Sequence, residues 1–373
     1  MTWKVLQGGR EIGWRVITTR PLQAGATLGK MPMSTTRRTL LAAASGLAIL
    51  PAVAFGEAGP SADPLPSWSD GTAKKGILAF VAQSTKAGSP DFIPIPERVA
   101  VFDNDGTLWP ENPVPFQLAF ALDSLSKQAA NNPQLKEDPF VQAALAGNMH
   151  ALLADQYKGL FHILGVTQAG MTTDEFDSRV ANWLKTAKHP RFGRRYDECI
   201  YQPMLEVLTF LRASGFKTYI VSGGGADFMR VWTERVYGIR PEQVVGSYVR
   251  TKFELRNGQA VLVKTADHIF IDDKEGKPVG IHQFIGRRPV MCFGNSDGDQ
   301  AMLEYTTIGN PRASFGSIVH HTDAEREYAY DSAPRSSGKL VEALAEASKR
   351  QWVVVDMQQD WNQVFAKSPE ERK

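Results

Sequence analysis

Short apolar runs recur along the chain and are separated by longer segments of mixed composition. Residues 99–102 read Val-Ala-Val-Phe, and comparable runs lie within residues 217–222, 287–293 and 351–355. Glycine-containing turns follow the first three runs. A short β-branched or aromatic run that ends in a turn is typical of a buried strand. The pattern therefore predicts a buried strand at each of these places.

Helical spacing dominates the segments between the runs. From about residue 113 to 189, apolar residues recur every three or four positions, with breaks at residues 131–133 and at Gly170. A hairpin is predicted around Asn257-Gly258. Strands that alternate with helices imply a parallel sheet, so the predicted fold class is α/β. Further helices are predicted at residues 203–214, 278–286 and 338–349, and turns that run into helices are predicted at residues 223–238 and 294–305.

Polar residues follow three of the predicted strands at the same end. Asp103 and Asp105 come after the first strand, Ser222 ends the second, and residues 295–299 (Asn-Ser-Asp-Gly-Asp) come after the third. In a parallel α/β sheet, ligands lie beyond the carboxyl ends of the strands. We therefore expect these three clusters, which are far apart in the sequence, to meet in one crevice.

The first cluster has a chemistry that fold stability does not require. Two carboxylates at the end of a buried strand repel each other unless a cation or a proton relieves them. One such aspartate can attack phosphorus as a covalent nucleophile, and the other can act as general acid and base. The Ser222 hydroxyl and the glycine amides after it can bind phosphate oxygens. The third cluster can complete a site for Mg²⁺, which prefers hard oxygen ligands.

Motifs in a fixed order carry a resemblance to a known family: DNDGT at 103–107, IVSGG at 220–224, GKP at 276–278 and GNSDGD at 294–299. Over residues 97–356 the chain resembles the haloacid dehalogenase superfamily. Within it, the chain is similar to the phosphatase branch, which includes phosphoserine-phosphatase-like enzymes and secreted acid phosphatases. The resemblance implies a Rossmann-like parallel sheet core with a helical cap inserted after the first core strand. The core would comprise residues 97–112 and 190–373, and the cap residues 113–189.

The resemblance also implies roles for the matching residues. The implied catalytic residues are Asp103 as nucleophile of a phosphoaspartyl mechanism, Asp105 as general acid and base, and Lys277, preferred to Lys264 and Lys274, as the charge-neutralising lysine. The implied phosphate-binding residues are Ser222, Gly223 and Thr107. Mg²⁺ is the implied cofactor, with Asp103, the backbone carbonyl of Asp105, Asn295 and Asp299 as its ligands.

One position departs from the branch. The acidic turn usually begins Gly-Asp, with that aspartate on the metal, but this chain has Asn295 there. An amide oxygen can still bind Mg²⁺, although the site loses one negative charge. We therefore expect weaker metal binding unless Asp297 or Asp299 becomes a ligand.

These features lead to an expected function. The resemblance implies a hydrolase acting on phosphoric monoester bonds, and Asp105 favours this over dehalogenation because a halide leaving group needs no proton. A cap of this size favours a small-molecule phosphomonoester as the substrate. A periplasmic protein that binds a phosphate ester without turnover, which Asn295 favours, and a phosphotransferase of the same fold are the alternatives.

The N-terminal segment has the pattern of an export signal. Residues 33–56 contain the pair Arg37-Arg38, an apolar stretch from Leu40 to Ala54 and small residues near its end. This layout is typical of a twin-arginine signal peptide, and the stretch is short for a membrane span, with an uncleaved anchor as the alternative. We expect a periplasmic or secreted protein without stable membrane insertion after cleavage. Residues 1–30 would then reflect a mis-assigned start codon, and residues 57–96 are expected to form an N-terminal arm or linker before the core.

Composition changes this picture in two respects. Residues 1–56 carry seven basic residues and one acidic residue, so their removal changes the formal net charge from +2 to −4. Nucleic-acid binding then loses its main support. Cys292 lies in an apolar run and is expected to be a buried free thiol, whereas the spacing to Cys199 does not decide whether the two pair. His320-His321 has no matching ligand cluster, which favours a structural or phosphate-neighbouring role.

Overall fold

The computed structural model describes residues 5–7, 10–12 and 63–367. It divides into two compact units, Met1–Pro60 and Ser61–Lys373. The expected signal peptide lies outside the described residues, so export stays a prediction. Within the described part of the chain, no helix combines the length and the apolar character that a membrane span needs.

The first unit contains one described feature, a short antiparallel pair. Its strands are β1 (Val5–Gln7) and β2 (Arg10–Ile12), with Val5 opposite Ile12.

The second unit is built on a seven-stranded sheet in the order β6-β5-β4-β3-β7-β8-β9. All neighbouring strands are parallel except β5 and β6. The α/β class and the parallel core predicted from the sequence are thereby confirmed. The strands are β3 (Val99–Phe102), β4 (Lys217–Gly225), β5 (Val244–Arg256), β6 (Gln259–Phe270), β7 (Met291–Gly294), β8 (Phe315–His320) and β9 (Val353–Asp356).

The register of the central strands brings the polar clusters together. Phe102 at the end of β3 lies opposite Ile220 of β4 on one side and Phe293 of β7 on the other. The residues that follow these three strands therefore meet at one edge of the sheet. This is the edge at which the sequence pattern predicts a ligand-binding crevice.

Helices cover both faces of the sheet. Ala100 and Phe102 of β3 pack in one cluster with buried residues of α1 and α6, whereas Val99 and Val101 pack in another with residues of α10, α11 and the turn after α9. Because successive side chains of a strand point to opposite faces of the sheet, the single apolar run of β3 packs against the helices on both faces. The helices of this core are α1 (Thr72–Thr85), α6 (Gln202–Ala213), α7 (Ala226–Arg230), α8 (Thr233–Tyr237), α9 (Gly276–Gly280), α10 (Gln300–Thr307), α11 (Glu342–Arg350) and α12 (Met357–Asp360).

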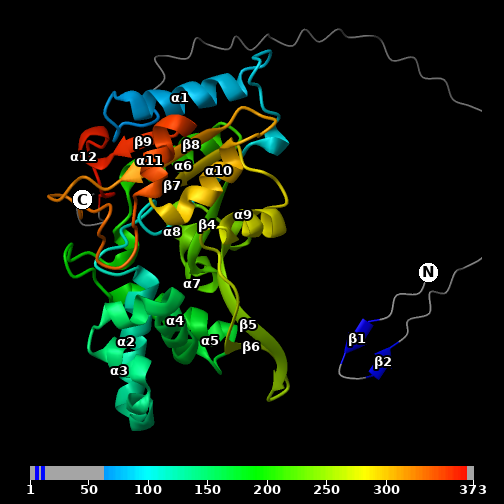
Figure 1. Cartoon of the computed structure of the whole chain (residues 1–373), viewed down its shortest axis with the longest axis vertical. Helices are drawn as coiled ribbons and strands as arrows, with labels where there is room; N and C mark the ends of the chain where they lie inside the picture. The colour runs from blue at the N-terminus through cyan, green and yellow to red at the C-terminus, as the bar shows by residue number, and fades with distance from the viewer. Residues whose placement is uncertain (1–4, 8–9, 13–62, 368–373) are drawn as a thin grey trace, which may run out of the picture. The chain divides into compact units, whose positions relative to one another are not determined.

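A group of helices inserted between β3 and β4 forms a separate layer beside the carboxyl edge of the sheet (Figure 1). We call this group the cap. Its helices are α2 (Phe116–Asn131), α3 (Pro139–Leu145), α4 (Met149–Gln168) and α5 (Thr173–Thr186). Three of these helices, α2, α3 and α4, share a small apolar core, which includes Leu125, Val141 and Ile163, whereas Phe176 and Val180 of α5 pack in the main cluster of the second unit.

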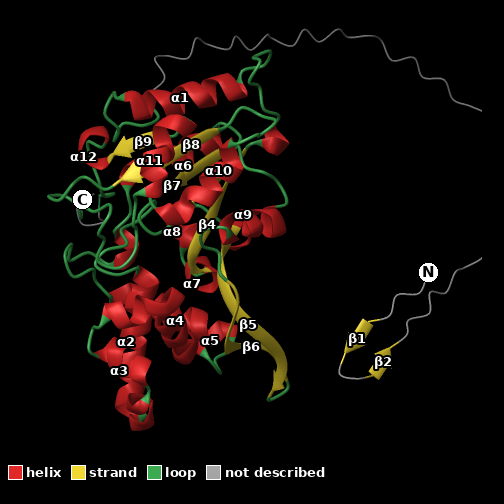
Figure 2. Cartoon of the chain, viewed as in Figure 1, coloured by secondary structure: helices red, strands yellow, loops and turns green. Residues whose placement is uncertain are grey.

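Strands β5 and β6 continue past the sheet as a long two-stranded extension, which we call the arm (Figure 2). Its turn is at Asn257 and Gly258, with φ values of 51° and 79°. Both lie in the left-handed region that an Asn-Gly hairpin turn uses, so the predicted hairpin is confirmed. On the cap side, Lys264 of β6 donates its N–H to the Met171 carbonyl and accepts from the Gly170 N–H, both at 2.9 Å.

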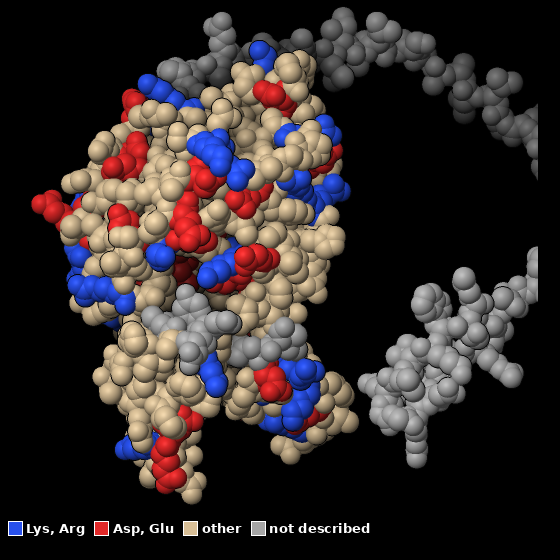
Figure 3. Space-filling model, viewed as in Figure 1, with Lys and Arg blue, Asp and Glu red and all other residues tan. Residues whose placement is uncertain are grey.

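Surface charge is mixed on the face shown in Figure 3, where Lys and Arg side chains lie beside Asp and Glu side chains over the core. Both cysteines of the sequence, Cys199 and Cys292, are buried free thiols. The expectation for Cys292 is therefore confirmed.

Candidate active site

Asp103 stands where β3 ends between β4 and β7. Its N–H donates to the Phe293 carbonyl at 2.9 Å. The residue is only 7% exposed, and its Oδ1 lies 3.0 Å from Nζ of Lys277. Burial raises the pKa of Asp103 well above its ordinary value; Lys277 opposes this shift, and the charges of Asp299 and Asp105 add to it.

Lys277 is the buried cation of the site. It lies on α9, is 1% exposed, and donates from Nζ to Asp299 Oδ1 at 2.6 Å and to the Val221 carbonyl at 3.1 Å. Burial alone would lower the pKa of this ammonium, but the charges of Asp103 and Asp299 outweigh it and raise the pKa. Lys277 is therefore charged and held against the predicted nucleophile, as the sequence analysis expected of the motif lysine.

The two aspartates of the acidic turn have different surroundings. Asp299 accepts from Lys277 at one oxygen and from the N–H groups of Asn295 and Ser296 at the other, at 2.9 and 3.0 Å. It thus holds Lys277 and the turn, and its metal binding stays a prediction. Asp297 instead accepts three backbone N–H groups at the start of α11. It caps that helix through Oδ1, and metal binding by Asp297 stays a prediction.

Asp105 has the environment of a proton carrier. Burial raises its pKa to about 7, although the hydrogen bond of 2.6 Å from Trp109 Nε1 opposes the shift and the charge of Glu111 adds to it. A carboxyl group whose pKa is near neutrality can give and take a proton at physiological pH. Asp105 lies within the same turn as Asp103, so the predicted nucleophile and acid are brought together.

The turn at the end of β4 lies beside Asp105. A Cβ at Gly224 would lie 3.5 Å from both Asp105 Oδ2 and Ser222 Oγ, so the backbone passes close to the two side chains. The Ser222 hydroxyl accepts from the Gly224 N–H at 3.2 Å, and the Gly225 N–H donates to Gln117 Oε1 at 2.6 Å. Gln117 belongs to α2 of the cap, which therefore touches the predicted phosphate-binding turn.

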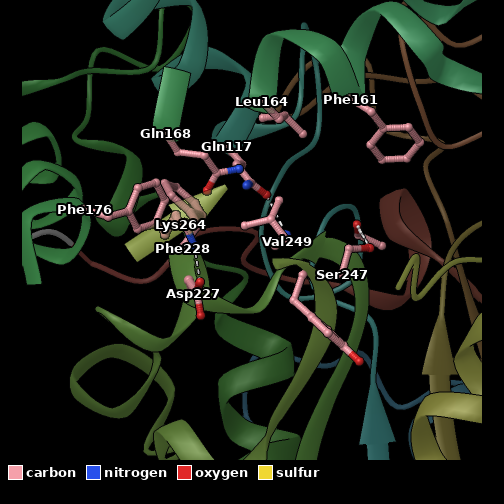
Figure 4. A pocket seen from close by; sticks show the side chains of 13 residues that line it. Gln117, Phe161, Leu164, Gln168, Phe176, Asp227, Phe228, Ser247, Val249 and Lys264 are labelled. Atoms are coloured by element: carbon pink, nitrogen blue, oxygen red, sulfur yellow. Dashed lines mark hydrogen bonds and ion pairs between the residues drawn. The ribbon is translucent and has the colours of Figure 1, made fainter. Parts of the chain in front are cut away.

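A small cavity lies between this turn and the cap (Figure 4). Its volume of about 30 Å³ is enough for about one water molecule. Lys264 projects into it, forms an ion pair with Asp227, and places Nζ 4.6 Å from the centre of the Phe176 ring. Asp103, Asp105 and Lys277 do not line this cavity, which lies beside them where the cap meets the turn after β4.

The geometry agrees with a family match over residues 100–304, more than half of the chain, to the model described as haloacid dehalogenase-like hydrolase. The chain belongs to the haloacid dehalogenase-like hydrolase family. No curated protein sequence matches this hydrolase.

Solved structures resemble this hydrolase at low sequence identity. A conserved protein of unknown function from Anaerococcus prevotii is 15% identical, with a TM-score of 0.45, over 67% of this chain and 86% of that one. A protein of unknown function from Bordetella pertussis is 16% identical, with a TM-score of 0.45, over 70% and 99% of the chains. A phosphoserine phosphohydrolase-like protein from Francisella tularensis is 12% identical, with a TM-score of 0.34, over 68% and 98%.

Thr107 and Asn295 interact with each other in this hydrolase. The buried Thr107 hydroxyl donates to Asn295 Oδ1 at 3.1 Å, so it is engaged by the amide, and phosphate binding by Thr107 stays a prediction. Asn295 Nδ2 donates to Glu111 Oε1 at 2.7 Å. The Gly223 carbonyl accepts from the Ser247 hydroxyl at 2.8 Å.

Two polar residues of the site, Glu111 and Gln117, were missed from the sequence. The signal of Glu111 was a lone acid shortly after the first motif, directly after Leu108-Trp109-Pro110. His321, which the sequence analysis did single out, contacts the same turn: Nε2 donates to the Gly106 carbonyl at 2.7 Å and Nδ1 contacts Glu327 at 3.0 Å. It supports the turn of the first motif, which is the structural role expected for it. Gln117 of the cap had no local signal.

Asp272, fully buried next to the site, gives this hydrolase a distinct pH dependence. Burial raises its pKa from 3.8 to about 8, against the opposing charge of Lys277. Between these values the folded protein holds a proton that the unfolded chain releases, so stability falls as pH rises, by about 1.4 kcal/mol per pH unit at most. We expect Asp272→Asn to remove this loss. In urea unfolding, the free energy of unfolding of the variant should therefore rise relative to that of the wild type as the pH goes from 5 to 8.

The control for this prediction is Asp267→Asn, which changes an exposed carboxylate of the arm. Its difference in free energy of unfolding from the wild type should stay constant over the same pH range. A constant difference for Asp272→Asn as well would contradict the protonated state of Asp272.

Proposed function

We propose that this hydrolase is an exported, Mg²⁺-dependent phosphatase that cleaves a small-molecule phosphomonoester through a phosphoaspartyl intermediate on Asp103. The observation that carries the proposal is the buried contact of 3.0 Å between Asp103 Oδ1 and Lys277 Nζ. A fold has no need of this contact, since burying a lysine among aspartates is costly. A nucleophile that must approach an anionic phosphate does need a fixed cation beside it.

The residues around Asp103 can carry both halves of the reaction. An Asp103 oxygen attacks phosphorus, the bond from phosphorus to the leaving oxygen breaks, and Asp105 gives that oxygen its proton. Water then attacks the phosphorus of the phosphoaspartate while Asp105 takes its proton, the bond from phosphorus to the Asp103 oxygen breaks, and inorganic phosphate leaves with the Asp103 carboxylate restored. Lys277 and the Ser222 hydroxyl would neutralise and hold the phosphoryl oxygens.

Mg²⁺ fits the donor chemistry of this site. The Asp103 carboxylate, the Asp105 carbonyl and the Asn295 amide oxygen are hard donors of the kind Mg²⁺ prefers. Asp103, Asp273 and Asp299 surround the one ammonium of Lys277, and a dication would relieve this surplus of negative charge. When bound, the ion would polarise the phosphoryl group. In the described residues no group of three or more His, Cys, Asp or Glu side chains is arranged to hold a metal ion.

The substrate class follows from the cap, and the location from the leader. The cap contacts the turn after β4 through the hydrogen bond from the Gly225 N–H to Gln117 Oε1, which favours a small leaving group that the cap can enclose. The pair Arg37-Arg38 followed by an apolar stretch supports export by the twin-arginine route.

Metal removal tests this function directly. We expect the full chain to release phosphate from p-nitrophenyl phosphate and from small alkyl phosphates with Mg²⁺, to lose turnover with a chelator, and to regain it when Mg²⁺ is restored. Phosphate release is measured together with circular dichroism, so that loss of fold is separated from loss of metal.

Other outcomes would point to the alternatives. A folded chain that binds phosphate esters and releases no phosphate would be a binding protein, as Asn295 would suggest. A phosphorylated product formed from an added alcohol, at the expense of free phosphate, would identify a phosphotransferase.

A further inference from the structure

The Asn295 side chain is held between two partners of different kinds. Its oxygen accepts from the Thr107 hydroxyl at 3.1 Å, and its nitrogen donates to Glu111 Oε1 at 2.7 Å. All three side chains are buried. Gly106 makes room for the contact, because a Cβ there would lie 2.2 Å from Asn295 Nδ2 and 2.4 Å from Glu111 Oε1.

Glu111 is surrounded by donors. The Tyr330 hydroxyl donates to Oε1 at 2.8 Å, the Ser337 hydroxyl donates to Oε2 at 2.6 Å, and Asn295 supplies the third hydrogen bond. The residue is only 3% exposed. A buried carboxylate with donors on both oxygens is fixed in place and acts toward Asn295 as an acceptor.

This arrangement decides which way the Asn295 amide points. The two ends of an asparagine amide have nearly the same shape, so only hydrogen-bond partners set its orientation. Thr107 can donate or accept and would tolerate either orientation. Glu111 accepts the amide nitrogen, and the oxygen must then lie toward Thr107. Because a carbonyl oxygen has two lone pairs and Thr107 uses one, the second remains for a cation.

We propose that Glu111 is a positioning residue for the metal site, which would fix the Asn295 oxygen as a ligand and, through its hydrogen bond to Asn295, supply the negative charge that an aspartate at this position would carry. This inference rests on the proposed function. Asn295 and Glu111 are then a matched pair in which one member is an acid and the other an amide. Replacing Asn295 alone by aspartate would bring two buried carboxylates into contact.

Exchange of the acid and the amide tests the pair. The full chain is prepared as wild type, Glu111→Gln, Asn295→Asp and the double variant. Mg²⁺ affinity is measured by calorimetry with Mg²⁺ alone, and the melting temperature is measured in chelator. Neither measurement depends on turnover.

Each variant has a distinct expected result. In Glu111→Gln the Asn295 amide can turn over, and Mg²⁺ affinity falls by about tenfold or more, as is usual when a residue that orients a metal ligand is changed. Asn295→Asp melts below the wild type in chelator because the two carboxylates repel each other. The double variant melts close to the wild type, because the glutamine introduced in place of Glu111 can donate a hydrogen bond to the aspartate. It also regains Mg²⁺ affinity, because both oxygens of a carboxylate can bind the ion whichever way the side chain turns.

Glu206→Gln is the matched control. Glu206 accepts from the Ser67 N–H and hydroxyl at 2.9 and 2.6 Å and from Gln202 Nε2 at 3.0 Å, away from Asn295. This variant should lose stability and keep its Mg²⁺ affinity.

The failures are distinguishable. Equal Mg²⁺ affinity in the wild type and Glu111→Gln would overturn the positioning role and leave the proposed function intact. A double variant that melts no higher than Asn295→Asp would overturn the matched pair. A folded wild type that binds no Mg²⁺ would overturn both the role of Glu111 and the metal requirement of the proposed function.

Discussion

Replacement of Asp103 by asparagine is expected to abolish phosphate release, with a loss of about a thousandfold or more in kcat. The amide cannot form the phosphoaspartyl bond. The fold should survive, because Lys277 keeps its contacts with Asp299 Oδ1 at 2.6 Å and with the Val221 carbonyl at 3.1 Å. Phosphate release and the melting temperature are measured on the same preparation.

Asp105→Asn is the matched comparison for this prediction. It removes the proton carrier but not the nucleophile, so its loss should depend on the leaving group, greater with an alkyl phosphate than with p-nitrophenyl phosphate. Asp103→Asn should fail with both substrates equally. If it kept more than about a tenth of the wild-type rate, Asp103 would not be the nucleophile.

Replacement of Lys277 by methionine is expected to abolish turnover and to lower the free energy of unfolding by about 3–5 kcal/mol. The ammonium is buried and contacts Asp103 and Asp299 at 3.0 and 2.6 Å, so its removal leaves uncompensated carboxylates. Urea unfolding in chelator measures the stability loss without a contribution from metal.

Two further variants separate the causes. Lys74→Met also removes a buried lysine with two aspartate partners, but the side chains of Asp63 and Asp70 are 44% and 89% exposed, so water can solvate them and the loss should be small. Lys277→Met with Asp299→Asn should regain part of the stability and none of the turnover. If Lys277→Met lost the expected free energy of unfolding and still turned over substrate, the place of Lys277 in the catalytic site would be contradicted.

The central part of the site could be predicted because its residues follow strands. Each of β3, β4 and β7 has its own apolar run, which shows where the strand lies in the sequence. The parallel register of these strands then brings Asp103, Ser222 and Asn295 to one edge of the sheet. Lys277 was found from its place in a motif that opens a helix. Strand β8 was missed, since its run Phe-Gly-Ser-Ile-Val-His contains polar residues and a glycine.

The surroundings of the site could not be predicted because they depend on loops. Asp297 and Asp299 are two residues apart, and only the packing of α11 shows that one caps a helix while the other holds Lys277. Glu111 meets Tyr330 and Ser337, which are 219 and 226 residues away in a segment without regular spacing. Contacts of this kind have no periodic signal for a sequence to carry.

The arm has a mechanical consequence for the cap. Backbone hydrogen bonds join Lys264 of the arm to Gly170 and Met171 of the cap, so neither can swing without the other. The ladder between β5 and β6 is irregular on both sides of Val249, where the arm leaves the sheet, and such irregularities are where strands bend. We therefore expect the arm and the cap to open together about Val249, so that their amide protons exchange with solvent in a single cooperative event.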